Sequence, residues 1–247
     1  MSSRPIFVVA GVGNGTGASA FPLRVFSKAG YRIALIARGS DKLNKLAAEL
    51  SQDGGEAATF PIGAYTYKEV QTAFAAVRAH WPDAEVRVAL YNAGYGVRKP
   101  FLELTEAEVA ESVETQVTAA FGFARSALLA FQAQALDARG KRGTLLLTGA
   151  TASWRGNTTT AAFAAGKFGL RALSQSLSKE FGKQNIHAII DGGILTDRSR
   201  GRGPEWESNP DIRLDPESIA KSYLYLAEQD RSAWTWELDL RPAHETW

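Results

Sequence analysis

Four glycines occupy alternate positions between residues 11 and 17, in the segment G-V-G-N-G-T-G that directly follows the apolar run Ile6–Val9. Helical apolar spacing then continues from Ala18 to Ala29. Glycines leave no side chain between backbone and ligand, and a helix N-terminus offers unpaired N–H groups and a positive dipole end. A strand, a glycine turn and a helix in this order favour dinucleotide binding over a merely flexible loop. The residues predicted to bind the pyrophosphate are Gly11, Gly13, Asn14, Gly15 and Gly17.

A basic residue, Arg38, follows the second apolar run. An NAD site usually carries Asp or Glu at this point to accept hydrogen bonds from the ribose 2′-hydroxyl, and neither Ala37 nor Arg38 can do so. An arginine forks onto a 2′-phosphate instead, with Ser40 and Lys42 as possible assistants. This pattern predicts NADP rather than NAD. In the alternative interpretation Arg38 is a solvated loop charge and Asp41 is the acid.

Apolar runs alternate with helical patterns along most of the chain, which is typical of parallel strands joined by helices that cover both faces of a sheet. The predicted strands are Ile6–Val9, Arg32–Ile36, Ala57–Pro61, Val86–Tyr91, Thr144–Leu147, His187–Ile190 and Trp234–Leu240. The later helices are predicted at Lys42–Ser51, Tyr67–His80, Glu106–Leu136, Ala161–Phe181 and Pro216–Glu228. We therefore expect an α/β fold, a Rossmann-type doubly wound sheet of about seven strands, in one domain spanning residues 1–247.

Ligands of such sheets bind beyond the carboxyl ends of the strands, so residues just after each strand are candidates for the site. Asn92 and Gly94 follow the fourth predicted strand. The segment Thr148–Ser153 follows the fifth, and Asp191–Thr196 follows the sixth. Asn92, Gly94 and Thr196 join the predicted cofactor-binding set.

Together these motifs resemble the short-chain dehydrogenase/reductase family, from about Pro5 to Asp197. The family's Thr-Gly-x-x-x-Gly-x-Gly corresponds to Ala10-Gly11 with Gly15 and Gly17, and its Asn-Asn-Ala-Gly to Tyr91-Asn92-Ala93-Gly94. Its Pro-Gly-x-x-x-Thr corresponds to Asp191-Gly192 through Thr196. The lysine of its Tyr-x-x-x-Lys motif corresponds to Lys167.

The resemblance implies a tyrosine that exchanges a proton with the substrate oxygen, with hydride moving to or from nicotinamide. It also implies a lysine that lowers the tyrosine pKa and holds the nicotinamide ribose, a serine that binds the substrate oxygen, and an asparagine. Here the lysine position keeps Lys167. The tyrosine position is Phe163, the serine position is Ala150, and the asparagine position is Gln116.

Phenylalanine has no titratable proton, so another group or a water must supply one if carbonyl chemistry occurs. Tyr95 and Thr151 are the candidate substitutes, because they follow the fourth and fifth predicted strands. Each also has a purely structural interpretation, as a packing tyrosine or a helix cap. Ala150 and Phe163 make the predicted cleft more apolar, which suits an apolar ligand. Near the third strand, Gly63 replaces the aspartate that the family directs to the adenine amino group.

The cofactor-binding motifs and the missing catalytic hydroxyls are compatible with three alternative functions. The first is an NADP(H)-dependent oxidoreductase that acts on a largely apolar carbonyl or alcohol through an atypical proton donor. The second is a non-redox isomerase, lyase or cyclase on the same fold. The third is a catalytically inactive regulatory protein that binds NADP(H).

Composition excludes other classes of function. The 247 residues include no cysteine and only three histidines, which argues against disulfides, thiolate nucleophiles and a histidine metal site. A net charge of +2 does not favour nucleic acid or an anionic membrane. The sequence shows no signal peptide and no apolar stretch of the roughly 20 residues that a membrane helix needs, so we expect a cytoplasmic protein.

Two further expectations come from the resemblance. The helices at Glu106–Leu136 and Ala161–Phe181 pair across subunits in the family, which implies a homodimer or homotetramer. The segment 197–215, rich in glycine and charge, lies where the family has its substrate lid, with Trp206 positioned to close over a ligand. In the alternative interpretation this segment is a surface loop.

Overall fold

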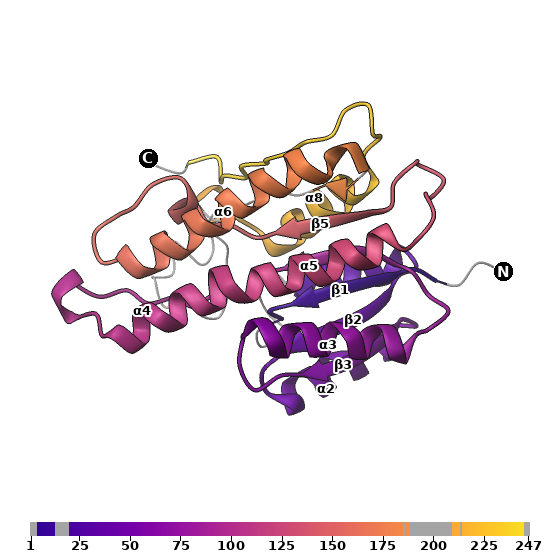
Figure 1. The fold of residues 1–247 in the computed structure, drawn as a ribbon, viewed down its shortest axis with the longest axis horizontal. Coiled ribbons are helices and arrows are strands. Elements are labelled where there is room, and N and C mark those ends of the chain that lie inside the picture. Colours follow the sequence, from indigo (N-terminus) through magenta and orange to yellow (C-terminus); the bar gives the residue numbers. More distant parts are fainter. Residues whose placement is uncertain (1–3, 13–19, 185, 188–208, 213, 245–247) are drawn as a thin grey trace.

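A computed structural model describes residues 4–12, 20–184, 186–187, 209–212 and 214–244. Six strands form one parallel sheet in the order β3-β2-β1-β4-β5-β6 (Figure 1). Their bounds are β1 Ile6–Ala10, β2 Arg32–Ala37, β3 Glu56–Pro61, β4 Val86–Tyr91, β5 Gly143–Leu147 and β6 Ile186–His187. Because β1 and β4 are neighbours while β2 lies on the other side of β1, the strand order reverses at the β1–β4 pair. This is the topological switch point at which such sheets bind ligands.

Helices cover both faces of the sheet. One face carries α3 (Tyr67–His80), α5 (Ala119–Gln132) and α6 (Ala161–Phe181), which lie in front of the strands in Figure 1. The opposite face carries α1 (Ala20–Lys28), α2 (Ser40–Gln52) and α8 (Pro216–Glu228). The helix α4 (Glu106–Val113) extends beyond the sheet and continues into α5.

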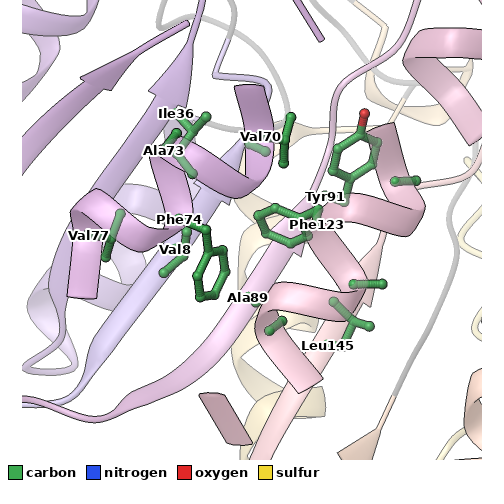
Figure 2. Close-up of a cluster of buried hydrophobic side chains, with 14 of the residues drawn as sticks. Val8, Ile36, Val70, Ala73, Phe74, Val77, Ala89, Tyr91, Phe123 and Leu145 are labelled. Carbon is green, nitrogen blue, oxygen red and sulfur yellow. The ribbon is translucent and has the colours of Figure 1, made fainter. Parts of the chain in front are cut away.

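The central strands are apolar on both faces, as expected for a parallel sheet that is covered twice. In β1, Ile6 and Val8 belong to the cluster under α3, α5 and α6, whereas Phe7 and Val9 belong to the cluster under α1, α2 and α8. Figure 2 shows the first cluster, with Val8 among side chains of α3, α5 and β4. Two buried cores therefore fix the sheet between its helical layers.

Most of the predicted elements are confirmed. The bounds predicted for β4, α3, α6 and α8 agree with the structure, and those for the other strands up to β5 differ by one residue at an end. The strand predicted at His187–Ile190 begins one residue earlier, and its residues 188–190 lie outside the described part of the chain.

The prediction of about seven strands is wrong at Trp234–Leu240, which forms no strand. Its alternating side chains bind helices and turns rather than a neighbouring strand. Glu237 forms two hydrogen bonds with the Arg171 guanidinium of α6, at 2.9 and 3.0 Å. Gln229 holds the Thr235 backbone N–H at 3.0 Å, just after α8. These contacts keep the segment against α6 and α8.

The helix predicted at Glu106–Leu136 is interrupted and ends earlier. Its residues Glu114–Thr118 form a π-helical turn between α4 and α5. The Tyr91 hydroxyl donates to the Thr115 carbonyl oxygen at 2.5 Å, and a side chain that binds into the helical ladder favours such a turn. The helix ends at Gln132, and the Gln134 side chain donates to the Val86 carbonyl oxygen of β4 instead.

Among the described residues, no helix is both long and apolar enough to cross a membrane. Of the predicted lid, residues 197–208 and 213 lie outside the described part of the chain. At its end, Asp215 caps α8 by accepting hydrogen bonds from the backbone N–H groups of Glu217 and Ser218.

Candidate active site

The ends of β1 and β4 meet at the switch point with almost no space between their backbones. Gly11 has φ +99°, and a Cβ atom at this position would lie 2.3 Å from the backbone nitrogen of Ala93. The Asn92 side-chain amide donates to the Gly11 carbonyl oxygen at 2.8 Å, and its backbone N–H donates to Ala10 at the same distance. Only glycine fits at position 11, both for backbone conformation and for space.

The rest of the predicted pyrophosphate loop remains a prediction. Gly13, Asn14, Gly15, Gly17 and Thr196 all lie outside the described residues. Of the predicted pyrophosphate-binding residues, the structure describes only Gly11, together with the strand ends around it.

Lys167 is the buried cation of this region. It lies on α6 with a relative exposure of 4%, and its Nζ donates to the Thr148 carbonyl oxygen just after β5 at 2.8 Å. A Cβ atom on Gly94 would lie 3.7 Å from the same Nζ, so the ammonium group lies at the ends of both β4 and β5. The ring centroid of Phe163, one helical turn earlier, is 5.9 Å from Nζ.

Gln116 adds an amide to the same place. It lies in the π-helical turn, is fully buried, and donates from Nε2 to the Ser112 hydroxyl at 2.8 Å. Its Oε1 has no hydrogen-bond partner among the described residues, and it lies 3.8 Å from the Cβ position of Gly94. A buried carbonyl oxygen without a partner costs free energy, so this atom suits a polar group bound beside Gly94.

The two positions at which the family carries reactive hydroxyls are apolar and partly accessible. Phe163 and Ala150 are both half-buried. The Ala150 backbone N–H donates to the Ser153 hydroxyl at 3.1 Å, and Ser153 is fully buried. The Ser153 side chain thus stabilises the turn after β5.

The two predicted substitutes lie at the expected strand ends. Tyr95 is half-buried and directly follows Gly94. Thr151 begins a short 3₁₀ turn, Thr151–Ser153, and its hydroxyl accepts a hydrogen bond from Arg241 at 2.6 Å. Arg241 also pairs with Asp239 at 2.7 Å. The C-terminal segment therefore holds Thr151 in place.

Arg38 lies at the outer end of the same edge, just after β2. Its Nη1 is 3.5 Å from a carboxylate oxygen of Glu111 on α4, and its guanidinium carbon lies 5.5 Å from the ring centroid of Tyr65. Ser40 lies in the first turn of α2, where its hydroxyl bonds Asp41. Sequence reasoning missed Glu111 and Tyr65, because a pairing between distant segments leaves no local pattern.

Glu69 places a carboxylate beside Gly63, the position at which the family carries an aspartate. Its carboxylate accepts hydrogen bonds from the backbone N–H groups of Gly63 and Ala64 at 2.5 and 3.1 Å. A Cβ atom on Gly63 would lie 3.3 Å from Glu69 Oε2, so this carboxylate reaches the place of the missing aspartate. The spacing Thr66-x-x-Glu69, typical of a helix N-terminus, was the available signal.

Two buried phenols frame the site without serving as acids. Burial raises the pKa of Tyr65 to about 12, although nearby Arg38 lowers it in part. Burial also raises the pKa of Tyr91 well above its ordinary value, and the hydroxyl of this residue donates to Thr115. Both side chains therefore stay neutral near pH 7. Tyr91 donates a hydrogen bond to Thr115, and the Tyr65 ring lies beside the Arg38 guanidinium.

A parallel sheet whose switch point carries a glycine of positive φ, an Asn-Ala-Gly segment and a buried lysine is typical of dinucleotide-binding α/β proteins. Residues 5–205 match the model of the short chain dehydrogenase family. The chain belongs to this family.

Individual proteins agree with this assignment. A short-chain dehydrogenase structure from Rhodopseudomonas palustris is 31% identical, covers 96% of this chain and 98% of its own, and has a TM-score of 0.78. An alcohol dehydrogenase from Thermococcus sibiricus, complexed with 5-hydroxy-NADP, is 24% identical with a TM-score of 0.82 and covers 98% and 99% of the two chains. The 3-oxoacyl-[acyl-carrier-protein] reductase MabA of Mycobacterium tuberculosis is 28% identical over 171 residues. That match spans 66% of each chain.

Proposed function

We propose that this protein is an NADP(H)-dependent oxidoreductase that acts on a largely apolar carbonyl or alcohol. The observation that carries the proposal is the position of the Lys167 ammonium group, which is buried between the Thr148 carbonyl oxygen and Gly94. The bound complexes named for the Thermococcus alcohol dehydrogenase and for an actinorhodin polyketide ketoreductase with NADPH support a nicotinamide cofactor.

The residues at the switch point fit such a cofactor. Gly11 and Gly94 present bare backbone, and the buried Gln116 Oε1 lies beside Gly94. An ammonium group can donate three hydrogen bonds, and we infer that Lys167 binds the hydroxyls of the nicotinamide ribose. The nicotinamide supplies the hydride chemistry when bound. Arg38 would bind the 2′-phosphate, which favours NADP over NAD.

The proton must come from a group other than residue 163. We propose that a water molecule beside Lys167 donates it to the substrate oxygen during carbonyl reduction and that solvent replaces it. The Lys167 charge favours this transfer, because it stabilises the hydroxide-like character that develops on the water. The apolar side chains of Ala150 and Phe163 favour an apolar substrate at this position.

A second candidate is a regulatory protein that binds NADP(H) without turnover. The observation that favours it is the absence of a hydroxyl at both Ala150 and Phe163. A general acid in the right place is worth about 10²–10⁴-fold in rate, and its loss can leave binding intact. A non-redox isomerase, lyase or cyclase on the same fold would also tolerate these substitutions.

One assay separates these functions. The purified protein is incubated with NADPH and a panel of apolar ketones and aldehydes, and the loss of nicotinamide absorbance is followed. We expect NADPH oxidation that is abolished by Lys167→Met and retained by Lys179→Met, a control on the exposed end of α6. Tight NADPH binding with no oxidation by any carbonyl would favour the regulatory protein or the non-redox enzyme over the oxidoreductase. Failure to bind either NADPH or NADH would overturn all dinucleotide functions.

A further inference from the structure

Three side chains from distant segments meet at the outer end of the dinucleotide edge. Arg38 follows β2, Tyr65 lies between β3 and α3, and Glu111 lies on α4. They border a cavity of about 400 Å³. Glu114, in the π-helical turn that follows α4, also lines it.

The Arg38 guanidinium already has an anionic partner here. Its Nη1 lies 3.5 Å from Glu111 Oε1, and the two side chains are 53% and 44% exposed. A guanidinium binds a phosphate through the same planar N–H groups with which it binds a carboxylate. Glu111 and a 2′-phosphate would therefore accept hydrogen bonds from the same N–H groups of Arg38.

The surrounding charges strengthen this competition. Glu114 lines the same cavity, so two carboxylates face any phosphate that approaches Arg38. These carboxylates and the phosphate are like charges and repel one another. Because the side chains are partly exposed, salt screens the repulsion, which is strongest at low ionic strength. The buried Tyr65 ring lies under the guanidinium, and a cation can stay over an aromatic face while its other partner changes.

We propose that Glu111 competes with the 2′-phosphate of NADP(H) for Arg38 and so limits the preference of the protein for NADP(H) over NAD(H). This inference rests on the proposed function, because it requires that Arg38 reads the 2′-phosphate. Glu111 is then a residue that determines cofactor specificity without serving in hydride or proton transfer.

Equilibrium binding of NADPH and NADH tests the proposal, with nicotinamide fluorescence as the signal. NADH is the matched ligand, since it lacks only the 2′-phosphate. We expect Glu111→Gln to tighten NADPH binding about two- to fivefold at low salt, the range that an exposed ion pair is worth. NADH binding should stay unchanged, and the gain should shrink in 0.5 M salt, because the Debye length then falls below about 5 Å.

Two further variants show whether the effect passes through Arg38. In an Arg38→Gln background, Glu111→Gln should raise NADPH affinity by no more than Glu114→Gln does in the parent, because only the direct repulsion remains and no guanidinium is left to be released. Glu114→Gln removes an equal charge from the same cavity without touching the ion pair, and we expect a smaller gain. Thermal unfolding of each variant, measured without nucleotide, checks that the fold is retained.

The outcomes separate the two proposals. If Arg38→Gln weakens NADPH binding and leaves NADH binding unchanged, Arg38 binds the 2′-phosphate as proposed. The effect of Glu111→Gln then shows whether Glu111 competes for it. An equal change for both nucleotides, or a gain from Glu111→Gln that is undiminished without Arg38, would overturn the competition. An Arg38→Gln variant with unchanged NADPH affinity, or a parent protein that binds neither nucleotide, would overturn the proposed cofactor use and this inference with it.

Discussion

The two ends of the dinucleotide edge are built in different ways. At the inner end, Gly11, Asn92 and Lys167 are held by backbone contacts, and the ammonium group is buried. At the outer end, Arg38 and Glu111 are about half exposed and meet through a single ion pair. Backbone geometry therefore determines the structure of the inner end, whereas the charges of individual side chains determine what the outer end binds. We expect substitutions at the inner end to unfold or inactivate the protein, and substitutions at the outer end to change only its cofactor affinity.

At the inner end, the residue expected to bind the cofactor is present, whereas the residues that carry out proton transfer in the family are replaced. Lys167 keeps its family identity, while the hydroxyls expected at Phe163 and Ala150 are absent. The largest predicted effect follows from restoring them. Phe163→Tyr with Ala150→Ser should raise carbonyl-dependent NADPH oxidation about 10²–10⁴-fold, because the phenol supplies a general acid near Lys167.

The control for this pair is Phe163→Leu with Ala150→Ser, which restores no titratable group at position 163. Steady-state kinetics with NADPH and the most reactive carbonyl would measure the gain. An unchanged rate in the variant with Phe163→Tyr and Ala150→Ser, with NADPH binding intact, would show that the lack of a proton donor does not limit turnover.

The next effect tests the tight backbone at the inner end. Gly11→Ala should lower the free energy of unfolding by about 3–5 kcal/mol, because the new Cβ collides with backbone atoms and the φ angle is positive. Gly39→Ala is the matched control, since Gly39 has φ +83° but no atom within 4 Å of its Cβ position. We expect a cost of about 1–2 kcal/mol there, from backbone strain alone. Urea unfolding measures both, and equal costs would refute the role of close approach.

The free energy that the contact between Glu237 and Arg171 of α6 contributes to folding should depend on pH. Hydrogen bonds from Arg171 lower the pKa of Glu237, so the folded state favours its carboxylate more than the unfolded state does. This stabilisation is fully present above the ordinary Glu pKa of about 4.3 and is lost as pH falls through the lowered folded value.

Glu237→Gln should therefore cost about 1–2 kcal/mol at pH 7 and progressively less below pH 4. Glu217→Gln, which breaks an exposed pair with Lys221, should cost less than about 0.5 kcal/mol at any pH. Unfolding curves at pH 7 and at pH 3 provide the test. A cost for Glu237→Gln that is the same at both would contradict the assigned cause.

The smallest effect concerns the two substitute hydroxyls. Thr151→Val and Tyr95→Phe should each change turnover by less than about threefold, because water rather than either hydroxyl supplies the proton; loss of a general acid would cost about 10²-fold or more. A loss of that size in one variant, with NADPH affinity unchanged, would identify that residue as the donor instead.

The sequence predicts this fold well where periodicity and caps agree. The bounds of α3 follow from its apolar spacing and the Thr66 cap, and β4 follows from its apolar run. The alternation at Trp234–Leu240 misled because Glu237 binds a helix instead of facing a neighbouring strand. A two-residue period describes side-chain direction and does not reveal the partner.

Some residues of the candidate site were likewise predictable from the sequence, and others were not. Motif order located Gly11, Asn92 and Lys167, because their spacing along strand ends carries the geometry. The sequence carried no sign that Arg38 meets Glu111, since their contact depends on how far α4 reaches beyond the sheet. The unpartnered oxygen of Gln116 was equally hidden, because this residue lies in a π-helical turn that the sequence pattern did not predict.

That turn has a consequence for the two ends together. The π-helical turn Glu114–Thr118 joins α4, which carries Glu111, to α5, which is anchored in the core. A π-helical turn takes about one residue more than an α-helical turn, so it accommodates an extra residue without rotating α4 relative to α5. Removing one residue from this turn would restore a continuous α-helix and leave Glu111 facing Arg38, whereas a deletion in a regular α-helix rotates the flanking residues by about 100°. The turn is therefore the point at which this long helix tolerates a change of length while the Arg38–Glu111 pair and the core contacts of α5 both stay in register.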